Sequence, residues 1–253
     1  MNRLFLAILF FTWNFLSAQN MDGAWQLIYL DEKPVEDTIT IKIYQDGYFA
    51  YASWDANTNE FLSAAGGEFF IDSGYSEKYD FHTSDSTLVG REITFEGFHR
   101  YDGLVLAEIG GGVEKAWKRI SVNKNNLSGT WVFTGRERDG KMQRSTPGAR
   151  RTIKILSGDR FQWIAFNSET GEFFGTGGGT YSAENGKYTE NIEFFSRDNS
   201  RAGAKIPFDY TLNDNEWHHK GKSSKGDPMY EIWSPYRVAY EDENENEEED
   251  EDE

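Results

Sequence analysis

An internal duplication constrains this chain more than any other feature of its sequence. The segment TITIKIYQDGYFAYASWDANTNEFLSAAGGEFF at 38–70 is matched by RRTIKILSGDRFQWIAFNSETGEFFGTGGGTYS at 150–182, at a constant offset of 112 residues. DGAW at 22–25 is likewise matched by SGTW at 128–131. Similarity that keeps its order and spacing over such a length indicates two copies of one unit. Each copy spans about a hundred residues, the size of a small domain.

The hydrophobic period within each unit is two, which predicts β-strands. In TITIKIY, the isoleucines at 39, 41 and 43 share one face, and Thr40 and Lys42 share the other. The segments RFQWIAF and KIPFDYTL alternate in the same way. Turn signals such as QDG, SGD and AENGK recur between such segments, and no stretch after residue 18 keeps a helical period. The pattern predicts an all-β, antiparallel fold with about eight strands per unit. Both a sandwich and a closed barrel fit it, and a barrel would remove the exposed sheet edges.

The two ends of each unit resemble the calycin superfamily of lipocalins and fatty-acid-binding proteins. Each unit opens with Gly-x-Trp, in GAW at 23–25 and GTW at 129–131, and closes on a tryptophan in KAWKRI or EIWSPY. The resemblance implies two tandem up-and-down barrels. It also implies that the opening tryptophan plugs one end of its barrel beneath an arginine from the last strand. The implied plugs and arginines are Trp25 and Trp131 with Arg119 and Arg237.

The second unit also resembles uncharacterised lipocalin-like domains of secreted bacterial proteins. The matching stretch is FQWIAFNSETGEFFGTGGGTYSAENGKYTENIEFFS. The Thr-Asp-Tyr motif, the following helix and the disulfide of true lipocalins have no counterpart in this sequence. The resemblance therefore transfers an architecture but no activity and no ligand-binding residues.

Four segments follow from these patterns. Residues 1–18 combine Arg3, an apolar run and the small pair Ser17-Ala18, which predicts a signal peptide cleaved after Ala18 and an exported protein, periplasmic or secreted. Barrel 1 is predicted over 19–121 and barrel 2 over 122–237, followed by a disordered acidic tail over 238–253. No other stretch approaches the length of a membrane span. The chain has no cysteine, so it has neither disulfides nor thiolate metal sites.

The net charge of −17 argues against nucleic-acid binding, because an acidic chain repels phosphates. Much of this charge lies in EDENENEEEDEDE at the C-terminus. Such a run can contact a basic partner or bind calcium weakly, because it lacks the preorganised oxygen ligands of a tight calcium site. Its plainest role is to keep the protein soluble.

The glycine cluster at 177–179 has two interpretations. A phosphate-binding loop needs a Lys and a Ser or Thr after its last glycine and then a helix. Here Thr180 and Tyr181 follow, then an ENGK turn, and the first unit carries SAAGGEFF at the same place. These features favour glycines that allow a strand to bend or bulge as a barrel closes. We further align Lys78-Tyr79 with Lys187-Tyr188 in the two units.

The candidate ligand-binding residues lie in the second unit. Glu190 shares a strand face with Ile192, and an inward carboxylate among aromatic rings would have a raised pKa. Neighbouring His218 and His219 must point to opposite faces of a strand, and the four histidines show no metal-ligand spacing. Aromatic side chains either line a cavity or simply fill the core. The candidate set is Trp163, Tyr181, Tyr188, Glu190, Phe208, Trp217 and His218, with no metal, cofactor or catalytic residue predicted.

The sequence therefore predicts a protein that binds a small apolar or amphipathic ligand inside one barrel, the second in preference to the first. Two alternatives remain. In the first, both barrels are solid and the protein has an interaction or structural role in the cell envelope. In the second, the protein is a barrel enzyme that uses Glu190 or His218.

Overall fold

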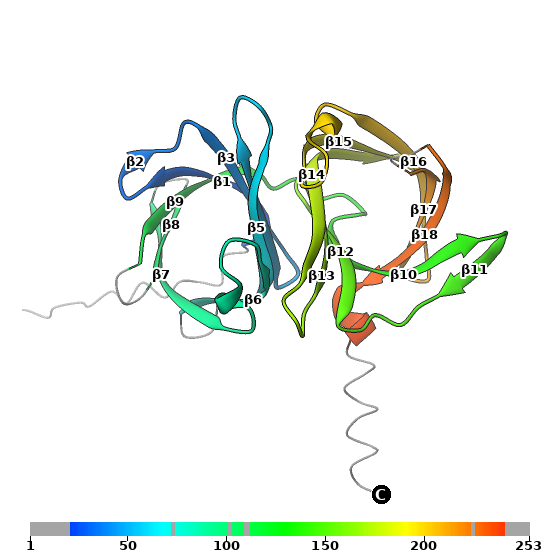
Figure 1. The fold of residues 1–253 in the computed structure, drawn as a ribbon, viewed down its shortest axis with the longest axis horizontal. Coiled ribbons are helices and arrows are strands. Elements are labelled where there is room, and N and C mark those ends of the chain that lie inside the picture. Colours follow the sequence, from blue (N-terminus) through cyan, green and yellow to red (C-terminus); the bar gives the residue numbers. More distant parts are fainter. Residues whose placement is uncertain (1–20, 72–73, 101–102, 109–111, 224–225, 241–253) are drawn as a thin grey trace, which may run out of the picture.

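The computed structural model describes residues 21–71, 74–100, 103–108, 112–223 and 226–240. It confirms two closed, eight-stranded antiparallel barrels in tandem (Figure 1). In barrel 1 the strands follow one another around the barrel, and pairing of the last strand with the first closes it. Its elements are β1 (Gly23–Leu30), β2 (Lys33–Pro34), β3 (Thr38–Gln45), β4 (Tyr48–Asp55), β5 (Phe61–Phe70), β6 (Tyr75–His82), the 3-10 turn η1 (Ser86–Leu88), β7 (Glu92–Arg100), β8 (Gly103–Glu108) and β9 (Glu114–Ser121).

Barrel 2 repeats this order element by element, which confirms the internal duplication. Pairing of its last strand with its first again closes the barrel. The short β11 lengthens the hairpin at the start, as β2 does in barrel 1. The elements are β10 (Gly129–Arg138), β11 (Lys141–Arg144), β12 (Arg150–Ser157), β13 (Arg160–Asn167), β14 (Phe173–Glu184), β15 (Lys187–Phe195), η2 (Asn199–Arg201), β16 (Lys205–Asn213), β17 (Glu216–Lys222) and β18 (Pro228–Pro235).

The predicted two-residue alternation is present, and it distinguishes an inner face from an inter-barrel face. On β3 the apolar Ile41 and Ile43 point out of their own barrel, into a core cluster shared with Ile153 and Ile155 of β12. Lys42 and the alternate residues on either side of it, Thr40 and Tyr44, point into the interior of barrel 1 instead. The two barrels pack against each other through β3 and β4 of barrel 1 and β12 and β13 of barrel 2 (Figure 1). β3 and β12 are therefore buried on both faces.

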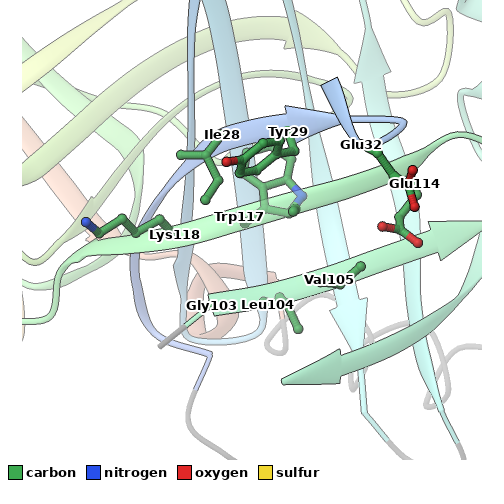
Figure 2. A pocket seen from close by; sticks show the side chains of 10 residues that line it. Ile28, Tyr29, Glu32, Gly103, Leu104, Val105, Glu114, Trp117 and Lys118 are labelled. Atoms are coloured by element: carbon green, nitrogen blue, oxygen red, sulfur yellow. The ribbon is translucent and has the colours of Figure 1, made fainter. Parts of the chain in front are cut away.

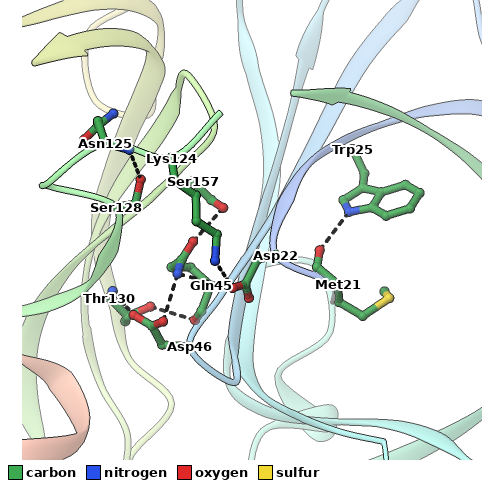
Figure 3. A network of polar contacts seen from close by, with 10 residues as sticks. All are labelled: Met21, Asp22, Trp25, Gln45, Asp46, Lys124, Asn125, Ser128, Thr130 and Ser157. Atoms are coloured by element: carbon green, nitrogen blue, oxygen red, sulfur yellow. Dashed lines mark hydrogen bonds and ion pairs between the residues drawn. The ribbon is translucent and has the colours of Figure 1, made fainter. Parts of the chain in front are cut away.

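A polar network closes one end of this inter-barrel face (Figure 3). Gln45, at the end of β3, accepts a hydrogen bond from Ser157 Oγ at 2.7 Å through its side chain, and from Thr130 Oγ1 at 2.9 Å through its backbone carbonyl. Asp46 accepts from the backbone N–H of Thr130 at 3.2 Å. Lys124 reaches Asp22 at 3.4 Å. Hydrogen bonds of this kind fix the relative orientation of two barrels that apolar contacts alone would hold less specifically.

The glycine pairs act as the sequence suggested, by allowing a bulge. The ladder register shifts between Gly66 and Gly67 against β6, and between Gly178 and Gly179 against β15. A Cβ on Gly179 would lie 2.1 Å from the carbonyl oxygen of Asn191. The cluster lies within β14, which continues through a hairpin into β15, so its glycines let the sheet bend as it curves into a barrel.

The predicted start of the acidic tail lies too early in the chain. Residues 236–240 form a short helical turn after β18. Tyr236 belongs to the inter-barrel core cluster, and Ala239 and Tyr240 pack against it. Residues 238–240, which follow the boundary expected at 237, therefore belong to the folded part. The predicted signal peptide and the acidic run at 241–253 lie outside the described residues. No helix in the described ranges is long and apolar enough to cross a membrane.

Candidate functional site: the interior of barrel 1

Each barrel holds a buried lysine–glutamate ion pair at its centre. In barrel 2, Lys154 Nζ lies 2.7 Å from Glu190 Oε1. In barrel 1, Lys42 pairs with Glu77 in the same way. The two lysines occupy equivalent positions on β3 and β12, and the two glutamates occupy equivalent positions on β6 and β15. Burying a charge is costly unless it is paired, so each partner makes the other tolerable.

The acceptor capacity of Glu77 is almost fully used by its own barrel. Its Oε1 accepts from Lys42 and from the hydroxyl of Tyr75, which in turn lies 2.7 Å from the hydroxyl of Tyr44. Its Oε2 accepts from Tyr79 at 2.9 Å. Burial alone would raise the pKa of Glu77, but Lys42 and the tyrosine hydroxyls hold it below its usual value. Glu77 is therefore a carboxylate, and its partners are already in place.

Lys42 is surrounded by rings as well as by its carboxylate. Its Nζ lies 4.5 Å from the ring centroid of Phe49 and 5.6 Å from that of Trp117. Burial lowers the pKa of Lys42 from 10.5 to about 8, a change that Glu77 opposes. The ammonium form therefore predominates at neutral pH, held by the carboxylate and by cation–π contacts.

A cavity of about 150 Å³ opens beside this pair inside barrel 1. Its lining combines apolar side chains with hydroxyl groups and a second lysine, Lys115 of β9. The full lining is Leu27, Thr40, Lys42, Tyr51, Ser53, Ser63, Glu77, Tyr79, Phe95, Leu106, Lys115 and Trp117. A cavity of this size accommodates a benzene-sized body.

The ladder registers show why barrel 1 has room here. Leu104 pairs with Trp117 in barrel 1, and Trp217 pairs with the equivalent Trp233 in barrel 2. Leu104 therefore occupies the position that Trp217 has in barrel 2. Leu106 likewise stands where barrel 2 has His219, and Gly97 stands where it has Tyr210. Three bulky rings in barrel 2 are thus replaced by two leucines and a glycine in barrel 1.

In barrel 2 the same interior is filled by aromatic side chains that the sequence singled out. Trp217 and Tyr188 are fully buried, and their ring centroids lie 5.1 Å apart. Phe208 packs on Tyr188 and on His219. Tyr181 accepts a hydrogen bond from Asn125 at 2.8 Å. These residues lie together in one core cluster, and Trp163 packs at its edge.

Glu190 does project into barrel 2 as expected, but it already has partners. Besides Lys154 it accepts from the hydroxyl of Tyr188 at 3.0 Å. His218 lies on the outer surface, where its Nδ1 is 2.8 Å from the hydroxyl of Tyr230. The inward histidine is its neighbour His219, so a molecule inside barrel 2 would meet His219 and not His218.

His219 faces a second buried carboxylate. Its Nδ1 lies 3.8 Å from Glu231, which also accepts a 3.1 Å hydrogen bond from Arg136 Nε. Burial lowers the pKa of His219, and nearby Lys154 lowers it further, so the imidazole is neutral. Burial would raise the pKa of Glu231, but His219 and Arg136 bring it down to about 2.

The tryptophan plugs differ between the barrels. Trp25 donates to the carbonyl of Met21 at 3.1 Å, and the guanidinium of Arg119 lies 4.3 Å from its ring centroid. Trp131 donates to the carbonyl of Leu127 at 3.0 Å. The residue opposite Trp131 in the ladder is Pro235, so the predicted partnership with Arg237 does not form.

The reason is that Arg237 lies beyond the end of β18. Its guanidinium packs against Gly47, in the turn between β3 and β4 of the other barrel. The arginine expected to seal barrel 2 therefore contributes to the contact between the barrels.

A second hollow, of about 620 Å³, lies on the outside of barrel 1 (Figure 2). Ile28 and Tyr29 of β1, Val105 of β8 and Lys118 of β9 line it, with Glu114 at one end. This outer groove is an open surface feature, and it shares Trp117 with the inner cavity.

The candidate residues of barrel 1 were missed because this part of the two units was aligned in the wrong register. The ladders make Tyr79 equivalent to Ile192 and Tyr75 equivalent to Tyr188, which corrects the match of Lys78-Tyr79 with Lys187-Tyr188. In the correct alignment, Tyr75-Ser76-Glu77 answers Tyr188-Thr189-Glu190. This short Tyr-Ser/Thr-Glu repeat, together with Lys42 and Lys154 at the offset of 112, was the available signal for the paired charges.

Two eight-stranded antiparallel barrels fit a lipocalin-like fold. The family model of a domain of unknown function, DUF4488, matches residues 126–246, which contain barrel 2. No curated protein matches the chain. Among the described residues, no group of three or more histidine, aspartate or glutamate side chains is placed to hold a metal ion.

Proposed function

We propose that this protein binds a small amphipathic ligand inside barrel 1, in the manner of a lipocalin-like binding protein. The observation that carries the proposal is the inner cavity of about 150 Å³, which joins apolar walls to hydroxyl groups and a lysine. Binding sites are typically concave and mostly apolar, with a few placed polar groups. The volume restricts the ligand to a body of about the size of a single ring.

Barrel 2 takes the supporting role in this proposal. Its equivalent space is occupied by Trp217, His219 and Tyr210, and its face towards barrel 1 is buried. The expectation of a ligand in the second barrel therefore gives way to one in the first. Because Glu190 is committed to Lys154 and Tyr188, we assign it a structural role and not acid–base catalysis.

Membership of the calycin superfamily and export from the cytoplasm belong to the same proposal. The first is supported by the two Gly-x-Trp motifs and by the packing of Arg119 on Trp25. The second is supported by the apolar run and small residues before Gln19. N-terminal sequencing of the protein recovered from its native host tests export, because cleavage after Ala18 would leave Gln19 as the first residue.

Methyl NMR with a ring-sized probe tests the binding site. Benzyl alcohol should shift the methyl signals of Leu27 and Leu106, which line the inner cavity, in a saturable way. The methyl signals of Ile28, which lines the outer groove, should stay in place. Absence of a saturable shift with this and other ring-sized probes would favour solid barrels and a structural role.

Two substitutions on neighbouring strands locate the site further. Leu106→Phe on β8 fills the inner cavity, and Lys118→Phe on β9 places the same ring at an exposed position of the outer groove. We expect Leu106→Phe to abolish probe binding and Lys118→Phe to preserve it, with both variants giving a native-like spectrum. The opposite pattern would move the ligand to the outer groove and contradict the proposal.

A further inference from the structure

The inner cavity differs from its counterpart in barrel 2 by an uncompensated positive charge. Lys115 lines the cavity at the position where barrel 2 has Glu231, which is balanced there by Arg136. Lys42 in the same cavity is neutralised by Glu77. Of the carboxylates whose side chains the structure describes, none lies within ion-pair distance of Lys115. The cavity therefore carries one positive charge more than its own groups balance.

A further donor, the hydroxyl of Tyr51, also faces this space. His82 Nδ1 accepts the backbone N–H of Asp85 at 2.9 Å, so in the neutral imidazole the proton sits on Nε2. Burial lowers the pKa of His82 although Asp85 opposes the change, and the net lowering favours that neutral form. His82 Nε2 lies 3.3 Å from the hydroxyl of Tyr51 and donates to it. The hydroxyl hydrogen of Tyr51 is then directed elsewhere, and Tyr51 lines the cavity.

Trp117 also lines the cavity and is 4% exposed. Its indole nitrogen is covered by protein atoms and has no hydrogen-bond partner among the described residues, so Trp117 offers the cavity its ring and not a donor. The strongest acceptor, Glu77, is already occupied by Lys42, Tyr75 and Tyr79. Apart from the lysines, the remaining polar groups of the lining are hydroxyls, which donate as well as accept, so a bound anion would find donors for its oxygens.

We propose that the ligand of barrel 1 is a small organic anion, a carboxylate on a ring-sized apolar body, with its negative oxygens paired to Lys115. This inference rests on the function proposed above and specifies its ligand class. One unbalanced lysine matches one negative charge, and a charge-assisted hydrogen bond is stronger than a neutral one. Leu27, Phe95 and Leu106 supply the apolar walls for the body of the ligand.

Three probes of nearly the same shape test this class: benzoate, benzyl alcohol and benzylamine. Their dissociation constants are measured on the full chain by titrating the methyl signals of Leu27 and Leu106. We expect benzoate to bind about tenfold or more tightly than benzyl alcohol, and benzylamine to bind most weakly. Lys115→Met should bring the affinity for benzoate down to that for benzyl alcohol and leave the alcohol nearly unaffected. Lys115→Gln serves as a second neutral variant if the methionine variant does not fold.

Lys118→Met is the matched control, because Lys118 lies on the same strand but lines the outer groove. It should leave the preference for benzoate intact. If Lys118→Met removes the preference, the anion sits in the outer groove and the inference is overturned. If benzyl alcohol binds as well as benzoate in the unmodified protein, the anionic class is refuted while the binding function stands. If none of the three probes binds, the proposed function fails together with the inference.

Discussion

The contact between the two barrels predicts that they unfold as one unit. Trp54 of β4 belongs to barrel 1, but its side chain lies in the inter-barrel cluster, where its ring stacks on Phe194 of barrel 2 with centroids 4.7 Å apart. Trp54 is only 1% exposed. Truncating a buried tryptophan to alanine removes the transfer free energy of the ring and leaves a cavity, which together cost about 4 kcal/mol. Set against a total stability of about 5–15 kcal/mol for a typical protein, this is a large loss.

Urea denaturation combined with hydrogen exchange resolved by peptide measures this coupling. In the unmodified protein we expect amides of both barrels to exchange through one global opening. In Trp54→Ala the opening free energy should fall by about 4 kcal/mol, in β16 and β17 as much as in β3. Leu62→Ala, at a 50% exposed position on β5, is the control and should change stability by less than about 0.5 kcal/mol.

One result would refute the reasoning. If Trp54→Ala weakens protection only in barrel 1, while β16 and β17 keep their original opening free energy, the barrels are independent folding units. The shared apolar cluster would then contribute little to either, and the face between the barrels would be a contact without energetic consequence.

Three further predictions concern barrel 2. Because the pKa of Glu231 is about 2 in the folded state against 4.5 ordinarily, it stabilises the fold by about 3 kcal/mol above pH 4.5. This contribution should disappear as the pH falls towards 2, so urea titrations of Glu231→Gln should show a flatter acid limb. Lys154→Met alone should cost about 3–5 kcal/mol by leaving a buried charge unpaired, whereas Lys154→Met with Glu190→Met should cost clearly less; equal losses would contradict this. Gly179→Ala should lower the melting temperature because its Cβ meets backbone at 2.1 Å, whereas Gly148→Ala, with nothing within 4 Å, should not.

The architecture could be predicted from sequence because it depends on patterns that repeat. The duplication, the two-residue alternation and the paired glycines each have one physical interpretation in an antiparallel barrel, and the structure contains all three. What the alternation could not tell was which face of β3 is the inner one. The isoleucine face, which reads as a barrel core, is the inter-barrel face, and the face with Lys42 lines the barrel. A strand buried on both sides gives no sequence signal that separates an interior from an interface.

The cavity could not be predicted because it is the space that remains when smaller side chains fail to fill the barrel. It exists because Leu104, Leu106 and Gly97 occupy positions that have larger side chains in the second unit. These positions lie in β7 and β8, after the stretch in which the two copies still resemble each other. Only the strand pairing seen in the structure shows that Leu106 is equivalent to His219, because the two sequences do not align there. The candidate set therefore gathered in the better-matched second unit, whose aromatic side chains fill the core.

The two copies also separate what the fold needs from what a ligand would need. The lysine–glutamate pair occurs in both barrels, including the one whose interior is filled, so it belongs to the architecture. Lys115 and the hydrogen-bonded pair of Tyr51 and His82 occur only beside the cavity. Barrel 2 puts a carboxylate and a tryptophan at the positions equivalent to Lys115 and Tyr51. A shared feature of two diverged copies reports their common fold, and a feature confined to the copy with room for a ligand is the better guide to function.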